Sequence, residues 1–446
     1  VRGDLQIDWN ATFAATLHNR VIRTLLAIAA IFGYKINQRD IANAFLNSLI
    51  DSIVYVEFPA GMGGEPGYCL LLLRALYGLK QAPNLWQKEF SQSLVKCGLR
   101  QSKTERCLFL NKGLIVFFFI DDVLTMYKQR NTAEYEALWK KLTGYYEIRD
   151  MGEANWFLGM RIIRDEANRT IYLCQDSYIE KIAKRFHLIK DTDNYPVTPL
   201  PTNIKLVKFD GQAMKVEMNV YQQKVGSLLY GTISTRADAA HAAAKLSSFM
   251  TNPSPEHQSL VDRSIQYLYG TRFLAMKLGP NPSSHTFSAA ADASYADNPD
   301  RKSSEGQLFR LFSGSIDWTA RKQRTVTTST TEAELLAMSE AARSLFYWKR
   351  FFNDIGLDIG HQYTIDCDNR QTVKAMTGDE NIQTRLRHIN IHNHWLREQY
   401  REKNINIRWV PTEAMPADGL TKPLSIAQHA EFVKDLGLVD IRHLIQ

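Results

Sequence analysis

The stretch Val116-Phe117-Phe118-Phe119-Ile120-Asp121-Asp122-Val123-Leu124 places two adjacent carboxylates between two apolar runs. The runs predict two short strands between residues 114 and 126 that form a hairpin with the acids at its tip. Two acids inside an otherwise buried hairpin are costly unless a cation or hydrogen bonds compensate them. A plain Asp-Asp turn is the alternative interpretation, because Asp is common in turns.

A third carboxylate is expected at the same place. Residues 34–40 predict a strand that ends at Asp40, and we expect Asp40 to share a site with Asp121 and Asp122. Three carboxylates repel one another until divalent cations bind, and Mg²⁺ takes such oxygen ligands together with substrate phosphates. Two metal ions would stabilise the attacking and leaving oxygens of an in-line displacement.

The elements around the hairpin predict a region of mixed helix and strand. We expect helices over 13–32, 82–97 and 133–145, and further strands over 52–58, 156–163 and 170–173. This order resembles a palm-type split βαβ sheet and is assigned to residues 1–165. Residues 166–284 are expected to be mostly helical, and 281–284 have the composition of a linker.

Residues 285–446 predict a separate α/β domain with four dispersed acids, Asp292, Glu334, Asp368 and Asp418. Asp292 and Asp368 follow predicted strands over 287–291 and 363–365. Glu334 lies on the inward stripe of a long helix predicted over 331–355. Glu332 lies about 200° away around that helix, so we expect it to face water. The pattern suggests a second metal site; four unrelated acids among 47 are the alternative.

Composition sets outer limits on the class of protein. The 446 residues are 45% hydrophobic with a net charge of +7, which excludes disordered, collagen-like and coiled-coil chains and weakly favours a polyanionic partner. Five scattered cysteines without metal-ligand spacing favour a reduced intracellular setting, and no structural zinc is expected at His388, His392 and His394. The longest apolar runs are too short to span a bilayer. The chain opens at Val1, and we expect a fragment of something longer.

Five short motifs, in order along the chain, resemble copia-type retrotransposon Pol polyproteins in their reverse transcriptase and ribonuclease H region. The matching stretches are Asp40-Ile41-Ala42-Asn43-Ala44-Phe45-Leu46, Leu76-Tyr77-Gly78-Leu79-Lys80-Gln81-Ala82-Pro83, Phe119-Ile120-Asp121-Asp122, Asp150-Met151-Gly152 with Trp156-Phe157-Leu158-Gly159, and Leu420-Thr421-Lys422-Pro423-Leu424. The acidic groups Asp292-Ala293-Ser294-Tyr295, Glu332-Ala333-Glu334, Asp368-Asn369 and Ala417-Asp418 are similar to a ribonuclease H domain.

The resemblance implies an α+β and α/β multidomain fold: palm and fingers, a helical thumb or connection, and a ribonuclease H-like domain. It implies that Asp40, Asp121 and Asp122 bind two Mg²⁺ or Mn²⁺ ions for DNA synthesis. It implies that Asp292, Glu334, Asp368 and Asp418 bind two ions for RNA cleavage. Phe45 would be the steric gate against a ribose 2′-OH. The other residues implied to bind substrate are Tyr77, Gly78, Lys80, Phe119 and His388.

The implied partners are an RNA template, a DNA primer, an RNA–DNA hybrid, deoxynucleoside triphosphates, and the integrase and protease segments of a parent polyprotein, with no membrane. The implied location is the cytoplasm, in a virus-like particle, and the nucleus. Arg321 and Lys322 are expected either to contact hybrid phosphates or to form a solvated basic loop.

Several positions depart from the family pattern. Phe119 replaces the usual Tyr, Ala15 stands where the family has Pro, and Asn390 replaces Asp. Val1-Arg2-Gly3 resembles the end of a fingers segment whose upstream Lys and Arg grip the triphosphate, so we expect those donors to be missing. Two alternatives follow: a non-catalytic nucleic-acid-binding relic of such an element, and a fragment with nuclease activity only.

Overall fold

The computed structural model describes residues 14–65, 67–280, 286–312, 314–360, 362–378 and 387–445. The expected linker at 281–284 lies outside the described residues, and so does the side chain of His388. Two compact units divide the chain. Unit 1 comprises residues 1–18, 33–154 and 354–356, and unit 2 comprises residues 19–32, 155–353 and 357–446. The largest segment of unit 1, residues 33–154, therefore follows the first helix of unit 2 in sequence.

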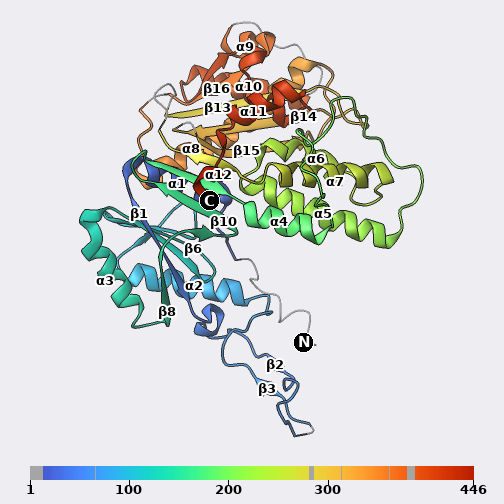
Figure 1. Cartoon of the computed structure of the whole chain (residues 1–446). Coiled ribbons are helices and arrows are strands. Elements are labelled where there is room, and N and C mark those ends of the chain that lie inside the picture. The colour runs from blue at the N-terminus through green and yellow to red at the C-terminus, as the bar shows by residue number, and fades with distance from the viewer. Residues whose placement is uncertain are drawn as a thin grey trace. The chain divides into compact units, whose positions relative to one another are not determined.

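Unit 1 is built on one antiparallel sheet with the strand order β4-β5-β6-β7-β1-β8 (Figure 1). Its elements are β1 (Lys35–Ile41), η1 (Ala44–Asn47), β2 (Tyr55–Val56), β3 (Leu70–Leu71), α2 (Ala82–Lys96), β4 (Arg100–Gln101), β5 (Leu108–Leu110), β6 (Leu114–Phe119), β7 (Asp122–Tyr127), η2 (Gln129–Asn131), α3 (Thr132–Leu142) and β8 (Ile148–Glu153).

Aromatic contacts fix α2 and α3 on one face of this sheet. Phe90 of α2 meets Phe118 of β6 edge to face at 4.9 Å between ring centroids, and Tyr135 of α3 stacks on Tyr127 of β7 at 4.2 Å. Phe118 pairs with Val123 across the hairpin. Alternate residues of a strand share a face, so Phe118 and Tyr127 both project toward the helices. Asp122 therefore projects from the opposite face.

Unit 2 contains two further sheets. An antiparallel sheet with the order β18-β12-β11-β10-β9 comprises β9 (Trp156–Phe157), β10 (Met160–Asp165), β11 (Thr170–Cys174), β12 (Leu274–Leu278) and β18 (Leu438–Asp440). A mixed sheet with the order β15-β14-β13-β16-β17 comprises β13 (Phe287–Ser294), β14 (Ser304–Leu311), β15 (Gly314–Lys322), β16 (Thr364–Cys367) and β17 (Asn406–Trp409). In the mixed sheet β13, β16 and β17 run parallel.

The helices of unit 2 cover these sheets and form a helical region with its own apolar core (Figure 1). They are α1 (Asn19–Phe32), α4 (Asp176–Arg185), α5 (Lys215–Ser234), η3 (Ala237–Ala239), α6 (Ala240–Ser247), α7 (Pro255–Gly270), α8 (Thr330–Ile355), α9 (Arg370–Thr377), α10 (Arg387–Arg401), η4 (Thr412–Ala414), η5 (Asp418–Leu420), α11 (Ile426–Asp435) and α12 (Arg442–Ile445). Among the described residues, every helix is too short or too polar to cross a membrane.

Buried polar contacts tie α1 into unit 2. The guanidinium of Arg23, 3% exposed, donates to the backbone oxygens of Ile316, Ile233 and Ser234 at 2.7 Å. It also lies over the ring of Trp318, at 3.9 Å from the centroid. Three carbonyl acceptors for one buried guanidinium satisfy most of its donors, which lowers the cost of burying that charge.

The structure confirms the predicted fold class and corrects the grouping of its strands. The strands predicted over 156–163 and 170–173 exist, but they pair with β12 and β18 instead of completing the sheet of Asp40. The sixth strand of that sheet is β8, over which sequence analysis placed no strand. The helix expected over 13–32 begins at Asn19, and the strand expected over 52–58 is reduced to Tyr55–Val56.

Candidate active sites

The first site lies at the turn between β6 and β7. Ile120 has a left-handed backbone with φ 58, a conformation that is strained for a β-branched residue. Two hydrogen bonds hold the turn: the Trp86 indole donates to the Ile120 oxygen at 2.7 Å, and the Ile41 amide donates to the Asp121 oxygen at 3.0 Å. The surrounding structure therefore fixes where the two acids project.

Strand register brings the three predicted acids together. Asp40 at the end of β1 is directly paired with Asp122 at the start of β7, and Asp121 precedes Asp122 in the turn. All three are half-buried. Gln38 donates to the Asp122 Oδ1 at 3.1 Å. Burial raises the pKa of Asp122, and the neighbouring charges of Asp121 and Asp40 raise it further.

An aromatic pair lies beside these acids. The rings of Phe45 and Tyr77 are 4.5 Å apart between centroids and tilted by 48°. Phe45 is 7% exposed and belongs to η1, which follows Asn43 in a left-handed conformation with φ 52. Burial raises the pKa of the Tyr77 hydroxyl, and the charges of Asp121 and Asp40 add to that shift. Tyr77 is thus within electrostatic reach of both acids.

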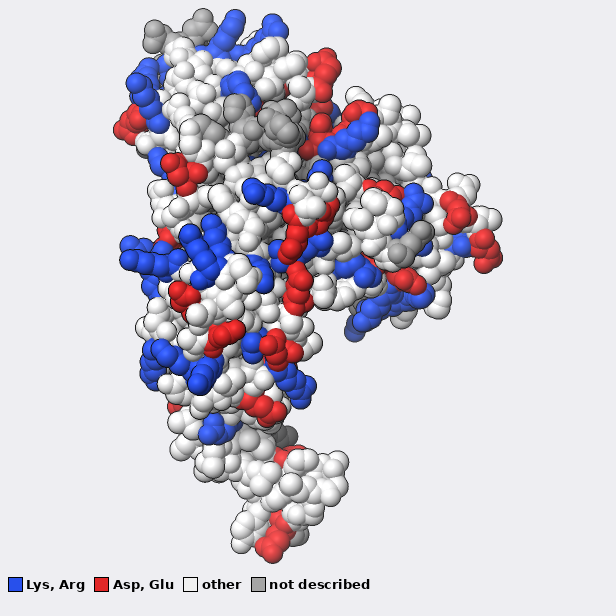
Figure 2. All heavy atoms as spheres, turned by 60° about the vertical axis from the view of Figure 1, so that its left-hand side comes forward, with Lys and Arg blue, Asp and Glu red and all other residues white. Residues whose placement is uncertain are grey.

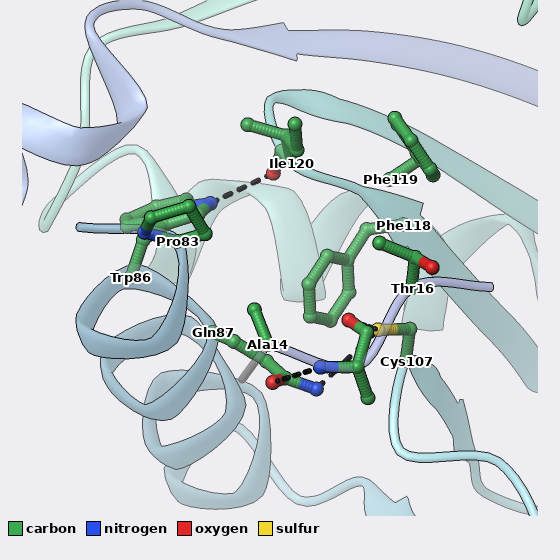
Figure 3. A pocket seen from close by; sticks show the side chains of 10 residues that line it. Ala14, Thr16, Pro83, Trp86, Gln87, Cys107, Phe118, Phe119 and Ile120 are labelled. Carbon is green, nitrogen blue, oxygen red and sulfur yellow. Dashed lines mark hydrogen bonds between the residues drawn. The ribbon is translucent and has the colours of Figure 1, made fainter. Parts of the chain in front are cut away.

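Three further residues were predicted for this site, namely Gly78, Lys80 and Phe119. Gly78 has φ 98, a value that favours glycine, and Lys80 is exposed just before α2. Phe119 lines a largely apolar cavity of about 510 Å³ between the hairpin and α2 (Figure 3). In that cavity Gln87 accepts from the Ala15 amide at 3.0 Å and donates to the Cys107 sulfur at 3.5 Å.

The second site gathers four acids from three elements and a turn of unit 2. Asp292 lies within β13, Asp368 follows the parallel strand β16, Glu334 is in the first turns of α8, and Asp418 begins η5. Asp292 is 4% exposed and Glu334 is 6% exposed. Ligand atoms of Asp292, Asp368 and Asp418 lie within 4.8 Å of one another, and so do those of Glu334, Cys367 and Asp368. Both groups share Asp368.

Burial and neighbouring charges disfavour the ionised forms of Asp292, Glu334 and Asp418. Burial raises the pKa of Asp292 to about 7, and the charges of Asp418 and Asp368 contribute. Burial also raises the pKa of Glu334 well above its ordinary value, with Asp292 and Asp368 adding to the shift. The pKa of Asp418 is raised by burial and opposed by the ammonium of Lys422. A bound cation would reverse this balance.

Two buried oxygens in this cluster, Glu334 Oε2 and Asp418 Oδ1, have no hydrogen-bond partner among the described residues. Buried carboxylate oxygens are normally paired, so each needs a partner that the protein does not provide. Oxygen-rich, closely spaced carboxylates are the ligands that Mg²⁺ and Mn²⁺ prefer. The residues present therefore fit a divalent cation.

Hydrogen-bond donors around this cluster were missed by the sequence analysis. The Thr421 hydroxyl donates to the Asp292 Oδ2, the Lys422 ammonium pairs with the Asp418 Oδ2 at 2.8 Å, and the Thr412 hydroxyl donates to the Asp368 Oδ2 at 2.8 Å. Thr421 and Lys422 belong to the motif Leu420-Thr421-Lys422-Pro423-Leu424, and in the sequence only their position three and four residues after Asp418 indicates a role at this site.

The expectation that Glu332 faces water is wrong. Glu332 is 3% exposed, and its Oε2 accepts from the Thr328 amide at 2.7 Å and the Thr328 hydroxyl at 2.6 Å. The helical period correctly separates Glu332 from Glu334 around α8. The face that carries Glu332 is buried because the preceding loop, which contains Thr328, folds over it. Arg321, expected either to contact phosphates or to be solvated, is held by Glu305 and Glu340.

Known proteins resemble this chain over most of its length. Residues 2–202 match the reverse transcriptase (RNA-dependent DNA polymerase) family. The chain is 32% identical over 435 residues to the Pol polyprotein of transposon TNT 1-94 from Nicotiana tabacum, covering 93% of this chain and 32% of that protein. It is 30% identical over 444 residues to the Pol polyprotein of transposon RE1 from Arabidopsis thaliana, covering 98% of this chain and 30% of that protein. The chain thus spans about a third of these relatives, and the resemblance to copia-type Pol polyproteins is confirmed.

Among solved structures, the chain matches a foamy viral protease-reverse transcriptase in complex with an RNA/DNA hybrid. It has a TM-score of 0.47 and 12% identity, and the match covers 87% of this chain and 45% of that chain. A ribonuclease H1 isolated from compost has a TM-score of 0.25 and 16% identity, and the match covers 31% of this chain and 94% of that chain.

Proposed function

We propose that this chain, which carries a reverse transcriptase domain and is related over most of its length to copia-type Pol polyproteins, synthesises DNA on an RNA template and cleaves RNA in RNA–DNA hybrids. One observation carries the proposal: two separate sets of acids converge, one at the paired residues Asp40 and Asp122 and one around Asp368. Phosphoryl transfer needs such acids because its catalysis is mostly positioning and charge stabilisation.

For DNA synthesis, we assign Asp40, Asp121 and Asp122 to two Mg²⁺ or Mn²⁺ ions. When bound, such ions neutralise charge on the phosphates and favour an in-line displacement. The chain's own contribution is a fixed turn: the bonds to Ile120 and Asp121 hold the acids at the strand ends, where a primer end and a triphosphate can approach. Gln38 orients Asp122.

For nucleotide selection, we assign the Phe45–Tyr77 pair. The close ring contact immobilises Phe45, and Tyr77 extends the aromatic surface toward the acids. A sugar bound at the acids would pack on this surface, and a 2′-OH would meet a ring that has little freedom to move. Gly78, Lys80 and Phe119 are assigned to the surrounding contacts with the nucleotide and template.

For RNA cleavage, we assign Asp292, Glu334, Asp368 and Asp418 to two Mg²⁺ or Mn²⁺ ions. Thr421, Lys422 and Thr412 each hold one of these carboxylates in place. The unpartnered oxygens of Glu334 and Asp418 are the atoms most in need of a cation. His388 is assigned to substrate positioning or product release.

Two assays on one preparation test the proposal. Primer extension on an RNA template and cleavage of a labelled RNA–DNA hybrid are measured in Mg²⁺, in Mn²⁺ and with a chelator. We expect both activities with metal and neither with chelator. Cleavage without extension would support a nuclease-only fragment, and hybrid binding without either reaction would support a non-catalytic relic.

A further inference from the structure

A cavity of about 500 Å³ in unit 2 is lined by segments that are distant in sequence. One wall comes from the helical region, through the loop at 200–208 and helix α6. The other comes from the α/β domain, through the β13–β14 loop, the end of β15 and the Lys422-Pro423 step. The metal assignments above do not account for this cavity.

Positive charge predominates in the lining. Six cationic side chains face two acidic ones, an excess of four. The acids are Asp297 and Asp300, and the cations are Lys205, Lys208, Lys245, Arg301, Lys322 and Lys422. A hollow lined mainly by one sign of charge concentrates the field and attracts the opposite charge.

Three of the cations already have acidic partners. Lys245 pairs with Asp297, Lys322 with Asp300 at 2.9 Å, and Lys422 with Asp418. Lys205, Lys208 and Arg301 are exposed and have no ion pair among the residues that the structure describes. Arg301 has a left-handed backbone with φ 60, and such strain is common where a loop presents a functional group. These three cations are available to a polyanion.

One residue of the cavity lining is a buried imidazole. His241 is 6% exposed and its Nε2 has no hydrogen-bond partner, while its ring is hydrogen-bonded to the backbone of Leu420. Burial and the charge of Lys245 lower the pKa of His241 to about 3, so the ring is neutral and does not add to the positive charge.

The cavity adjoins the second acidic site. Ser294, in its lining, is two residues beyond Asp292, and Lys422 reaches from the lining to Asp418. Apolar side chains such as Phe249, Pro299 and Pro423 lie among the cations, and sugars and bases pack on such surfaces. A strand held in the cavity would therefore lead to the nuclease acids.

We propose that this cavity binds the phosphodiester backbone of a nucleic acid strand as it enters the nuclease site, with Lys205, Lys208 and Arg301 contacting its phosphates. This inference rests on the proposed nuclease function and adds a binding site to it. The chemistry identifies phosphodiesters; an RNA–DNA hybrid and a single strand share it, and the experiment distinguishes them.

The test measures binding by the full chain in the presence of chelator, so that no cleavage occurs. Fluorescent RNA–DNA hybrid, single-stranded RNA and single-stranded DNA of one sequence are titrated at several salt concentrations. The variant Lys205→Ala/Lys208→Ala/Arg301→Ala is compared with Lys181→Ala/Lys215→Ala/Arg401→Ala, which removes three exposed cations outside the cavity. Melting temperatures confirm that both variants are folded.

We expect the cavity variant to bind at least about tenfold more weakly and to lose roughly one unit of salt slope per lost phosphate contact, up to about three. The control variant should change affinity less than about twofold. The strand type that loses most identifies the occupant. Equal losses in both variants, or an unchanged salt slope in the cavity variant, would overturn the inference.

The outcomes separate this inference from the proposed function. If the wild-type chain cleaves the hybrid in Mg²⁺ but the cavity variant binds like wild type, only the cavity assignment is wrong. If the wild-type chain neither cleaves nor binds any strand, both are wrong. Should the cavity variant fail to fold, photocrosslinking of thiouridine-containing strands to wild-type protein replaces it. Crosslinks within 200–208 or 294–301 support the cavity, and their absence there rejects it.

Discussion

The two acidic sites differ in how far the protein itself compensates their charges. In unit 1, Asp40, Asp121 and Asp122 are half-buried at the ends of strands and open to solvent. In unit 2, Asp292 and Glu334 are almost completely buried, and two oxygens of the cluster lack any partner. In the first site burial raises the pKa of Asp122, and the hydrogen bond from Gln38 opposes that shift. The second has a standing electrostatic cost that protons or cations must relieve.

This difference teaches that similar acids can depend on metal for different reasons. The open site needs metal mainly when a negatively charged substrate arrives. The buried site needs it even at rest, because its repulsion acts in a region of low dielectric. Among the described residues, both groups of potential metal ligands whose ligand atoms lie within 4.8 Å of one another belong to the buried site.

The largest expected effect is on the buried site. Glu334→Gln should reduce hybrid cleavage by roughly three orders of magnitude, because several kcal/mol of charge stabilisation are lost at constant volume. Primer extension should be within about twofold of wild type, since a different set of acids serves it. Both reactions are followed on one preparation, and substantial cleavage by the folded variant would remove Glu334 from the site.

The open site should show the reciprocal result. Asp121→Asn should reduce primer extension by roughly two to three orders of magnitude and leave hybrid cleavage within about twofold. The Ile41 amide donates to the backbone oxygen of Asp121, so the side-chain change should preserve this hydrogen bond and the turn. Circular dichroism checks that the variant is folded. If cleavage falls as much as extension, the two sites are not independent.

The pH dependence of stability should separate the two environments. The pKa of Asp292 is raised to about 7 in the folded protein, well above the ordinary value near 4. The folded state then binds a proton that the unfolded state releases, so stability is lost as pH rises from about 4 through about 7. The loss approaches roughly 4 kcal/mol for this group alone.

Calorimetry on chelated protein between pH 4 and pH 8 measures this loss, and Asp292→Asn should flatten the profile. Mg²⁺ should raise the melting temperature more at pH 8 than at pH 5, because ionised acids bind it better. A melting temperature for unit 2 that is independent of pH, with and without Mg²⁺, would contradict the interpretation of Asp292.

A smaller effect is expected at the aromatic pair of the open site. Phe45→Ala should raise the ratio of ribonucleotide to deoxyribonucleotide incorporation by roughly tenfold, because a ring beside the sugar is removed. Tyr77→Phe is the matched control and keeps the ring contact. Single-nucleotide incorporation rates measure the ratio; if it does not change in folded protein, Phe45 has only a packing role.

The smallest effect is expected for Glu332→Gln. The change replaces a charged acceptor for Thr328 with a neutral one and should cost about 1 kcal/mol of stability. Cleavage by the folded variant should stay within about twofold of wild type. Thermal unfolding and cleavage rates test this directly, and a defect as large as that of Glu334→Gln would add Glu332 to the catalytic set.

Sequence patterns located the acids of both candidate sites because most of them lie in or next to regular elements. Alternation and apolar runs located the β6–β7 hairpin, and the helical period placed Glu334 correctly on the inward face of α8. The pairing of Asp40 with Asp122 was expected only as proximity, since strand register depends on contacts outside each strand.

The errors share one physical cause, which is that long-range packing is invisible to local patterns. Glu332 is buried by the loop that carries Thr328, and no helical wheel contains a loop. Strands β10 and β11 were predicted to belong to the palm sheet because they follow it in sequence. In the structure β11 pairs with β12 (Leu274–Leu278), and β12 pairs with β18 (Leu438–Asp440). Thr421 and Lys422 became relevant only through the tertiary fold.

The pairing of β12 with β18 has a consequence for how the molecule is made. Leu274 lies opposite Asp440, and α1, at residues 19–32, belongs to the same unit. Unit 2 can therefore close only after more than four hundred residues have left the ribosome, whereas unit 1 needs little beyond residue 154. During synthesis the apolar face of α1 therefore stays exposed until the later segments of unit 2 have been made. Chaperone demand should thus be concentrated on unit 2, and slow translation should favour early folding of unit 1.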